Sequence, residues 1–175
     1  MNSNTGDTVQ RGRSNKLVAA TGEYLVAAEL CRRGLIATTF TGNVPHFDIV
    51  VSDAVGRNVS VQVKASRSDS WQIANIKSFC DISFDGKRQV VGRARRCPIR
   101  RLIMVYVTLD PDGNDKFYIL TWQRLRDIVI KHHKAYLKRC SGVRPRNWKS
   151  LHSAVNSDYL SPYENAWDTI EANLE

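Results

Sequence analysis

The sequence has no closely spaced pair of cysteines and no long apolar run. Its four cysteines, Cys31, Cys80, Cys97 and Cys140, lie far apart, which argues against a zinc ribbon or a disulfide framework. No apolar stretch approaches the roughly 20 residues that a membrane span needs. The first residues also lack the basic-then-apolar order of a signal peptide. We therefore expect a cytoplasmic protein with reduced thiols and no membrane partner.

Positive charge is abundant but unevenly distributed. The 175 residues carry a formal net charge of +9. Residues 86–149 contain 17 Lys and Arg against four acids, whereas residues 150–175 contain five acids and no Lys or Arg. Such clustering is typical of a nucleic-acid partner, although a solvated basic face would have the same composition.

The length and the 42% apolar content predict one compact domain with a hydrophobic core. We expect residues 1–13 to form a flexible polar tail and residues 14–175 to form a single domain with a C-terminal helical extension. Apolar residues at three- and four-residue steps predict helices over 16–33, 122–139 and 163–174. Short apolar runs predict strands over 35–40, 47–51, 59–64, 71–76, 102–109 and 116–120. This order favours an α/β fold with a central mixed β-sheet flanked by helices.

Two of these strands carry polar residues that a buried strand does not need. Asp48 lies in Phe47–Val51, Gln62 and Lys64 lie in Val59–Lys64, and the segment between them is typical of a tight turn. Side chains alternate along a strand, so Gln62 and Lys64 share one face. An antiparallel hairpin would bring an acid, an amide and an ammonium side by side. This face is either simply solvated or a metal-assisted phosphodiesterase site.

Glu23 is the candidate second acid. It lies near the middle of the predicted helix over 16–33, four residues before Ala27 and seven before Leu30, at the border of the apolar stripe. An acid at that border is either a helix-surface charge or a carboxylate directed at a site across the interface.

Phosphodiester cleavage needs a cation on the phosphate, an activated water and stabilisation of the developing charge. Mg²⁺ prefers oxygen ligands and keeps several waters. Asp48 and the Gln62 amide can supply part of that shell, Lys64 can orient or deprotonate water, and Glu23 can hold a metal-bound water. No glycine-rich phosphate loop, nucleophile elbow or His-Glu-x-x-His motif is present.

The segments TGEYLVAAEL (21–30), RG (33–34), FDIV (47–50) and VQVK (61–64) together resemble the PD-(D/E)XK nuclease superfamily, whose fold is restriction-endonuclease-like. They are most similar to the branch with archaeal Holliday-junction resolvases and intron-encoded homing endonucleases. The resemblance covers about a quarter of the chain. It implies a Mg²⁺- or Mn²⁺-dependent DNA endonuclease acting as a homodimer, with no small-molecule cofactor. It also implies that the metal is held by Asp48, Gln62, the Val63 backbone carbonyl and Glu23.

Two positions depart from the superfamily pattern. Phe47 replaces a proline that many members also lack, and Gln62 stands where many members have Glu. A neutral amide removes one negative charge from the metal site and should lower its affinity for cations. Gln-x-Lys variants with activity exist in the superfamily.

Basic segments provide candidate DNA contacts. We expect a basic loop at residues 92–96 and another at 144–149, whose side chains would bind phosphates: Arg93, Arg95, Arg96, Arg144, Arg146 and Lys149. Trp148 could stack on a base or pin its loop to the domain, and Ser66 could donate to a phosphate or form a turn. His46 could touch a phosphate or have no role. On the second helix we expect His132 to be packed and His133 exposed.

Two other functions remain open on the sequence. One is a nucleic-acid-binding protein that keeps the fold without cutting. The other is a protein-interaction domain whose basic middle meets its own acidic C-terminal segment or an acidic partner.

Overall fold

The computed structural model describes residues 5–40 and 44–175, with side chains described from residue 14 onward within these ranges. A long helix is followed by an antiparallel three-stranded meander: α1 (Thr5–Arg32), β1 (Ile36–Thr39), β2 (Ile49–Ser52) and β3 (Asn58–Ser66). An insertion of three strands and a 3-10 helix (η1) comes next: β4 (Ser70–Ile73), η1 (Ile76–Ser78), β5 (Cys80–Asp85) and β6 (Arg88–Ala94). The remaining elements are β7 (Leu102–Thr108), β8 (Lys116–Thr121), α2 (Trp122–Arg139), β9 (Ser153–Asn156), α3 (Ser157–Leu160), η2 (Ser161–Tyr163) and α4 (Asp168–Glu171).

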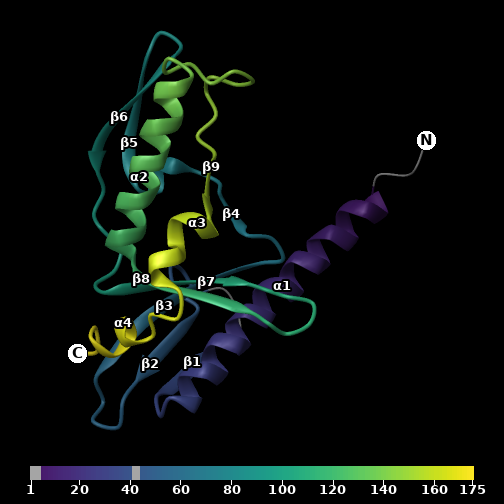
Figure 1. Cartoon of the computed structure of the whole chain (residues 1–175), viewed down its shortest axis with the longest axis vertical. Coiled ribbons are helices and arrows are strands. Elements are labelled where there is room, and N and C mark those ends of the chain that lie inside the picture. The colour runs from purple at the N-terminus through teal and green to yellow at the C-terminus, as the bar shows by residue number, and fades with distance from the viewer. Residues whose placement is uncertain (1–4, 41–43) are drawn as a thin grey trace.

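The central sheet has five strands in the order β1-β2-β3-β7-β8. β3 and β7 are parallel, and the other neighbours are antiparallel. Two further sheets have two strands each, one formed by β5 and β6 and the other by β4 and β9. This confirms the predicted α/β class with a central mixed sheet flanked by helices. Figure 1 shows α1 beside β1 and β2 at one end, with α2 and the β5–β6 hairpin extending together from the other.

The core lies on both faces of β7, all of whose residues from Leu102 to Val107 are buried. Ile103, Val105 and Val107 pack with the α1 side chains Val26 and Leu30. On the opposite face, the alternate residues of β7 pack with α2. Because successive side chains of a strand point to opposite faces, β7 forms the middle of a helix–sheet–helix stack.

Helix α1 begins at Thr5, not at Lys16 as predicted, so much of the segment predicted as a polar tail is helical. Its early residues lack the apolar spacing on which helix prediction relies, and Figure 1 shows this end of α1 projecting beyond the sheet. Among the described residues, no helix combines the length and the apolar character of a membrane span. All four cysteines are free thiols.

Three further predictions about the secondary structure are wrong at least in part. The strand predicted over 71–76 ends at Ile73, and the 3-10 helix η1 begins at Ile76. Of the loop predicted at residues 92–96, residues 92–94 belong to β6, which pairs with β5, and only Arg95 and Arg96 lie beyond the strand. The single helix predicted over 163–174 is replaced by short pieces, of which α4 spans only Asp168–Glu171. Asn165 has a φ of +53°, which is incompatible with a continuous right-handed helix. The apolar spacing instead places Trp167, Ile170 and Leu174 against the α1 face of the core.

Candidate functional site

The predicted hairpin is formed by β2 and β3. Asp53 N donates to the Arg57 carbonyl at 3.0 Å, and Gly56 adopts a φ of +84° that an L-residue rarely accepts. The register pairs Ile49 with Val61, and Asp48 directly precedes this first pair. The hairpin therefore brings Asp48 to the strand that carries Gln62 and Lys64.

Asp48 is held at the edge of β3 by two hydrogen bonds. Its backbone N–H donates to the Val61 carbonyl at 2.8 Å, and its Oδ2 accepts from the Val63 N–H at 2.7 Å. β2 begins only at Ile49, so the carboxylate caps a part of β3 that β2 does not cover. The N–H and C=O of one strand residue face the same edge, which places the Val63 carbonyl on the Asp48 side.

Gln62 and Lys64 share one face of β3, as predicted. Val61 and Val63 are buried on the other face, in the cluster that contains the α1 side chains. Gln62 is half-buried and Lys64 is exposed, and both line one cavity of about 550 Å³.

Glu23 lies next to the point where α1 comes closest to β3. A Cβ added to Gly22 would lie 2.5 Å from the Ala65 Cβ, so only glycine allows the helix this approach. Glu23 is half-buried. Burial raises the pKa of the Glu23 carboxyl, the charge of Asp48 raises this pKa further, and the charge of Lys64 opposes the rise. The charges of Asp48 and Lys64 thus both act on Glu23.

The donor set fits a hard divalent cation. The described residues include no group of three His, Cys, Asp or Glu side chains suited to a metal. The candidate ligands are instead two carboxylates, the Gln62 amide oxygen and the Val63 carbonyl. All are oxygen donors of the kind that Mg²⁺ and Mn²⁺ accept together with water. The negative charge of Asp48, which helps to raise the pKa of Glu23, is one that a bound cation would offset.

Two of the predicted DNA-contacting arginines lie near this site. Arg95 and Arg96 line the same cavity as Gln62 and Lys64. The Arg95 guanidinium also pairs with Asp81 at 3.0 Å. Arg93 is exposed on β6.

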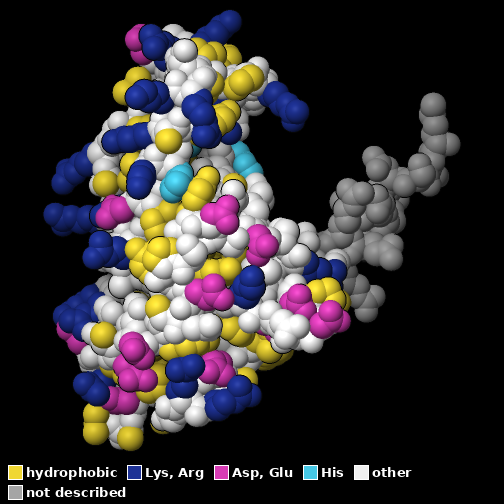
Figure 2. Space-filling view, viewed as in Figure 1, with side chains coloured by type: hydrophobic (Ala, Val, Ile, Leu, Met, Phe, Trp, Pro, Cys, Tyr) yellow, Lys and Arg dark blue, Asp and Glu magenta, His cyan; other side chains and the backbone are white. Residues whose placement is uncertain are grey.

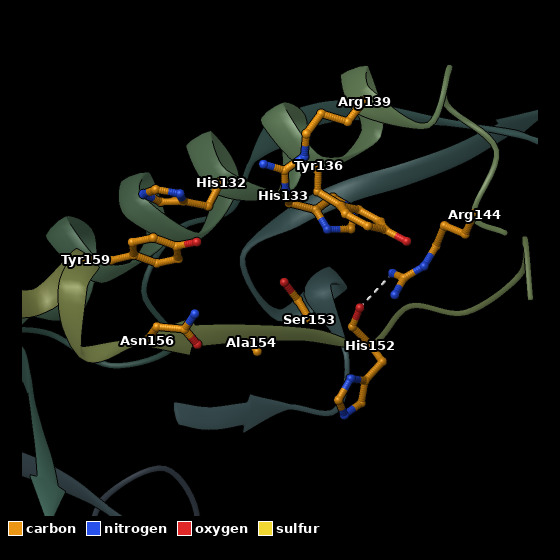
Figure 3. A pocket seen from close by; sticks show the side chains of 10 residues that line it. All are labelled: His132, His133, Tyr136, Arg139, Arg144, His152, Ser153, Ala154, Asn156 and Tyr159. Atoms are coloured by element: carbon orange, nitrogen blue, oxygen red, sulfur yellow. Dashed lines mark hydrogen bonds between the residues drawn. The ribbon is translucent and has the colours of Figure 1, made fainter. Parts of the chain in front are cut away.

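The other predicted contacts lie at the far end of α2. Trp122, at its start, lines the Lys64 cavity, whereas Tyr136 and Arg139, near its end, line a separate pocket with Arg144. An 18-residue helix is about 27 Å long. Figure 3 shows Arg144 in this pocket, donating to the His152 carbonyl at 2.6 Å. Arg146 lines an adjoining hollow.

Of the two helical histidines, His132 packs as predicted, but the prediction that His133 is exposed is wrong. His133 is buried and His132 is only half-buried. His133 Nε2 lies 3.2 Å from Gln89 Oε1, and the Gln89 amide donates to the carbonyls of Trp148 and Ser150. His132 instead stacks on Tyr159, with ring centroids 3.5 Å apart (Figure 3). The buried stripe of α2 therefore runs through Leu125, Val129, His133 and Leu137 at steps of four.

Two ambiguous residues have structural partners. The Trp148 ring packs edge-on against Phe84, with centroids 5.5 Å apart, while its carbonyl accepts from Gln89. These contacts favour a role in pinning the 144–149 loop. Ser66 Oγ accepts from the Ser68 N–H at 3.1 Å, the pattern of a serine turn. His46 has a φ of +76° and lines the Lys64 cavity.

Sequence reasoning missed the cavity itself. Trp71, Tyr106 and Trp122 form part of its wall while they are also buried in the core. The parallel register places Met104 beside Gln62 and Tyr106 beside Lys64. β3 and β7 are separated in the sequence by the whole insertion, so no local sequence pattern predicts how they pair.

No known protein family, no curated protein and no solved structure matched the chain.

Proposed function

We propose that this protein is a Mg²⁺- or Mn²⁺-dependent endonuclease that hydrolyses DNA phosphodiester bonds. The observation that carries the proposal is the hydrogen bond from Val63 N to the Asp48 carboxylate. It fixes an acid beside the strand that presents Gln62 and Lys64, while Glu23 approaches from α1. The order of α1, an antiparallel β1-β2-β3 meander and a parallel β7 supports a restriction-endonuclease-like core.

Each residue has a distinct role in this proposal. Asp48, Gln62 and the Val63 carbonyl bind the cation, and Glu23 acts through a metal-bound water. The cation would neutralise phosphate charge and make water a better nucleophile. Lys64 orients the attacking water and stabilises the negative charge that develops on the phosphate. Cutting both strands of a duplex needs two such sites, which a homodimer would provide.

The charge distribution supports a DNA partner. Figure 2 shows Lys and Arg concentrated on the part of this face over α2 and the β5–β6 hairpin. Arg95 and Arg96 extend positive charge to the cavity that Lys64 lines. Phosphate binding by such residues releases counterions, so DNA affinity should fall steeply with salt.

The test is to incubate the purified protein with branched, duplex and single-stranded DNA in Mn²⁺. We expect cleavage of at least one substrate by the wild type, loss of cleavage in Lys64→Ala, and retention in Lys116→Ala, a matched change of an exposed strand lysine. Cleavage that persists in Lys64→Ala would contradict the proposal, as would a wild type that cuts none of the three.

Gln62 favours a second candidate, a protein that binds nucleic acid without cutting. Its amide contributes no charge to the cation site, so the site has one negative group fewer than a Glu-x-Lys strand would give. Salt-sensitive DNA retention without cleavage in Mg²⁺ or Mn²⁺ would favour this function.

One contact supports the third candidate function, that of a protein-interaction domain. The Glu175 carboxylate pairs with Arg100 at 2.8 Å and with Arg101, so the acidic C-terminal segment meets part of the basic middle within the chain. Absence of DNA retention at low salt would favour this function over both nucleic-acid proposals.

A further inference from the structure

The cavity beside Lys64 has a floor that metal-assisted cleavage does not require. Its volume is about 550 Å³, within the usual range of small-molecule sites. The floor is made of buried, mostly aromatic and aliphatic side chains: Trp71, Phe79, Leu102, Met104, Tyr106 and Trp122. A phosphate and its cation interact with charges and oxygen atoms, so this apolar floor, which is also part of the core, is available to another group.

The rim of the same cavity is polar and exposed. It includes Lys64, Arg95 and Arg96, which can bind phosphates, and Gln72, whose amide can both donate and accept hydrogen bonds. Gln62, one of the proposed metal ligands, also lines the cavity. These groups match the parts of a nucleotide. The cations suit the charged phosphate, the amides suit the polar edges of the base, and the apolar floor suits the face of the base.

The floor is held in place by its own contacts. The Trp71 indole N–H donates to the Val107 carbonyl at 3.3 Å, and its ring packs edge-on against Tyr106 with centroids 5.1 Å apart. Phe79 stacks on Trp122 at 5.5 Å. Burial raises the pKa of Tyr106, which therefore remains a neutral phenol. A preformed recess loses little conformational freedom when a ligand enters it.

We propose that this cavity receives one unpaired nucleobase of the DNA strand whose phosphodiester lies at Lys64. The inference rests on the proposed nuclease function and narrows its substrate to DNA with an unpaired or extruded nucleotide next to the cut. A base stacked inside a duplex cannot reach buried side chains, so the nucleotide must leave the stack or be unpaired already.

The test uses a short DNA duplex with one unpaired 2-aminopurine nucleotide and the same duplex fully paired, both in metal-free buffer so that binding is separated from cutting. We expect binding of the unpaired form to be about tenfold tighter, since base stacking on aromatic residues is worth that order of free energy. The 2-aminopurine fluorescence should also change on binding.

Two variants test whether the preference for the unpaired duplex arises in this cavity. Ala74 is exposed and lines the cavity, so Ala74→Trp should obstruct it and abolish the preference while binding of the paired duplex persists. Ala135→Trp adds the same bulk at an exposed position on α2 and should retain the preference. A preference that survives Ala74→Trp would overturn the assignment to this cavity.

The remaining outcomes separate the two proposals. Equal binding of both duplexes by a protein that cuts DNA in Mn²⁺ would overturn the base pocket and leave the nuclease intact. A cavity-dependent preference without cutting would overturn the nuclease and leave base binding standing. Competition by a free deoxynucleoside monophosphate as strong as that of the unpaired duplex would overturn strand recognition, because the cavity would then bind free nucleotides.

Discussion

The backbone N–H of Val63 donates to the carboxylate of Asp48 across 2.7 Å. The hydrogen bond joins the residue before β2 to the middle of β3, so the position of the acid depends on the register of the hairpin. A slip of one residue would turn Gln62 and Lys64 to the opposite face and remove the partner of Asp48. The site is thus a property of the pairing between β2 and β3.

Asp48→Asn should lower Mn²⁺ affinity by about tenfold or more, because ligand charge sets the affinity of such oxygen sites. Isothermal titration calorimetry measures the effect. Asp53→Asn is the matched control on the same hairpin. Asp53 accepts from the Arg57 and Val55 N–H groups in the turn, so its loss should lower the thermal stability and leave Mn²⁺ affinity unchanged. Equal Mn²⁺ affinity in the wild type and Asp48→Asn would remove Asp48 from the ligand set.

Gln62→Glu should increase Mg²⁺ affinity severalfold, since it adds a negative charge beside the Asp48 carboxylate. Cleavage in Mg²⁺ should reach saturation at a lower metal concentration. Gln123→Glu adds the same charge at an exposed position on α2 and should leave the metal dependence unchanged. If the added carboxylate weakens Mg²⁺ binding, the Gln62 side chain does not face the cation.

Glu23 should make metal affinity depend on pH. Burial, and then the Asp48 charge, raise its pKa above the ordinary 4.5, so protons compete with the cation to a higher pH than at an exposed glutamate. Apparent Mn²⁺ affinity should therefore rise as pH increases from 4.5 through the raised pKa. Glu23→Gln should flatten this part of the titration. An unchanged pH profile in Glu23→Gln would show that another group is responsible.

Gly22→Ala should push α1 away from β3, because the new Cβ would lie 2.5 Å from the Ala65 Cβ. Overpacking of this kind costs about 1–3 kcal/mol of unfolding free energy, and Mn²⁺ affinity should fall as Glu23 moves. The double variant Gly22→Ala with Ala65→Gly removes the clash and should recover much of the affinity. Failure to recover any affinity would contradict the account of the close approach.

His133 should make folding stability sensitive to acid. Burial, and then the Arg144 charge, lower its pKa to about 4 from the ordinary 6.5. Between these values the unfolded chain binds more protons than the folded protein, so the free energy of unfolding falls as pH decreases from 6.5 to 4. Urea denaturation across this range should show a smaller loss in His133→Gln than in the wild type. His152→Asn, at an exposed histidine, should behave as the wild type does.

The sequence predicted what depends on local pattern. Alternation in Val61–Lys64 placed Gln62 and Lys64 on one face, and turn residues between β2 and β3 indicated the hairpin. Helix α2 was predicted with its bounds from its apolar spacing, and in the structure Thr121 caps its start and the buried spacing continues to Leu137. The exposure of His133 on this helix was predicted wrongly. His133 is buried and forms a hydrogen bond with Gln89, which lies on a strand far away in the sequence.

What the sequence could not predict depends on long-range pairing. Gly92–Ala94 resembled a basic loop because its exposed residues give no alternation, yet pairing with β5 makes it a strand. The cavity floor forms where β7 returns beside β3 and brings Met104 and Tyr106 next to Gln62 and Lys64. The split of the predicted DNA contacts follows from the length of α2, which separates Arg144 from Arg95.

The proposed metal site is tested most directly by anomalous diffraction from crystals grown with Mn²⁺. We expect a peak within ligand distance of the Asp48 carboxylate, the Gln62 amide oxygen and the Val63 carbonyl, with Glu23 at a metal-bound water or second ion. A crystal saturated with Mn²⁺ that shows no peak between Asp48 and Gln62 would contradict it.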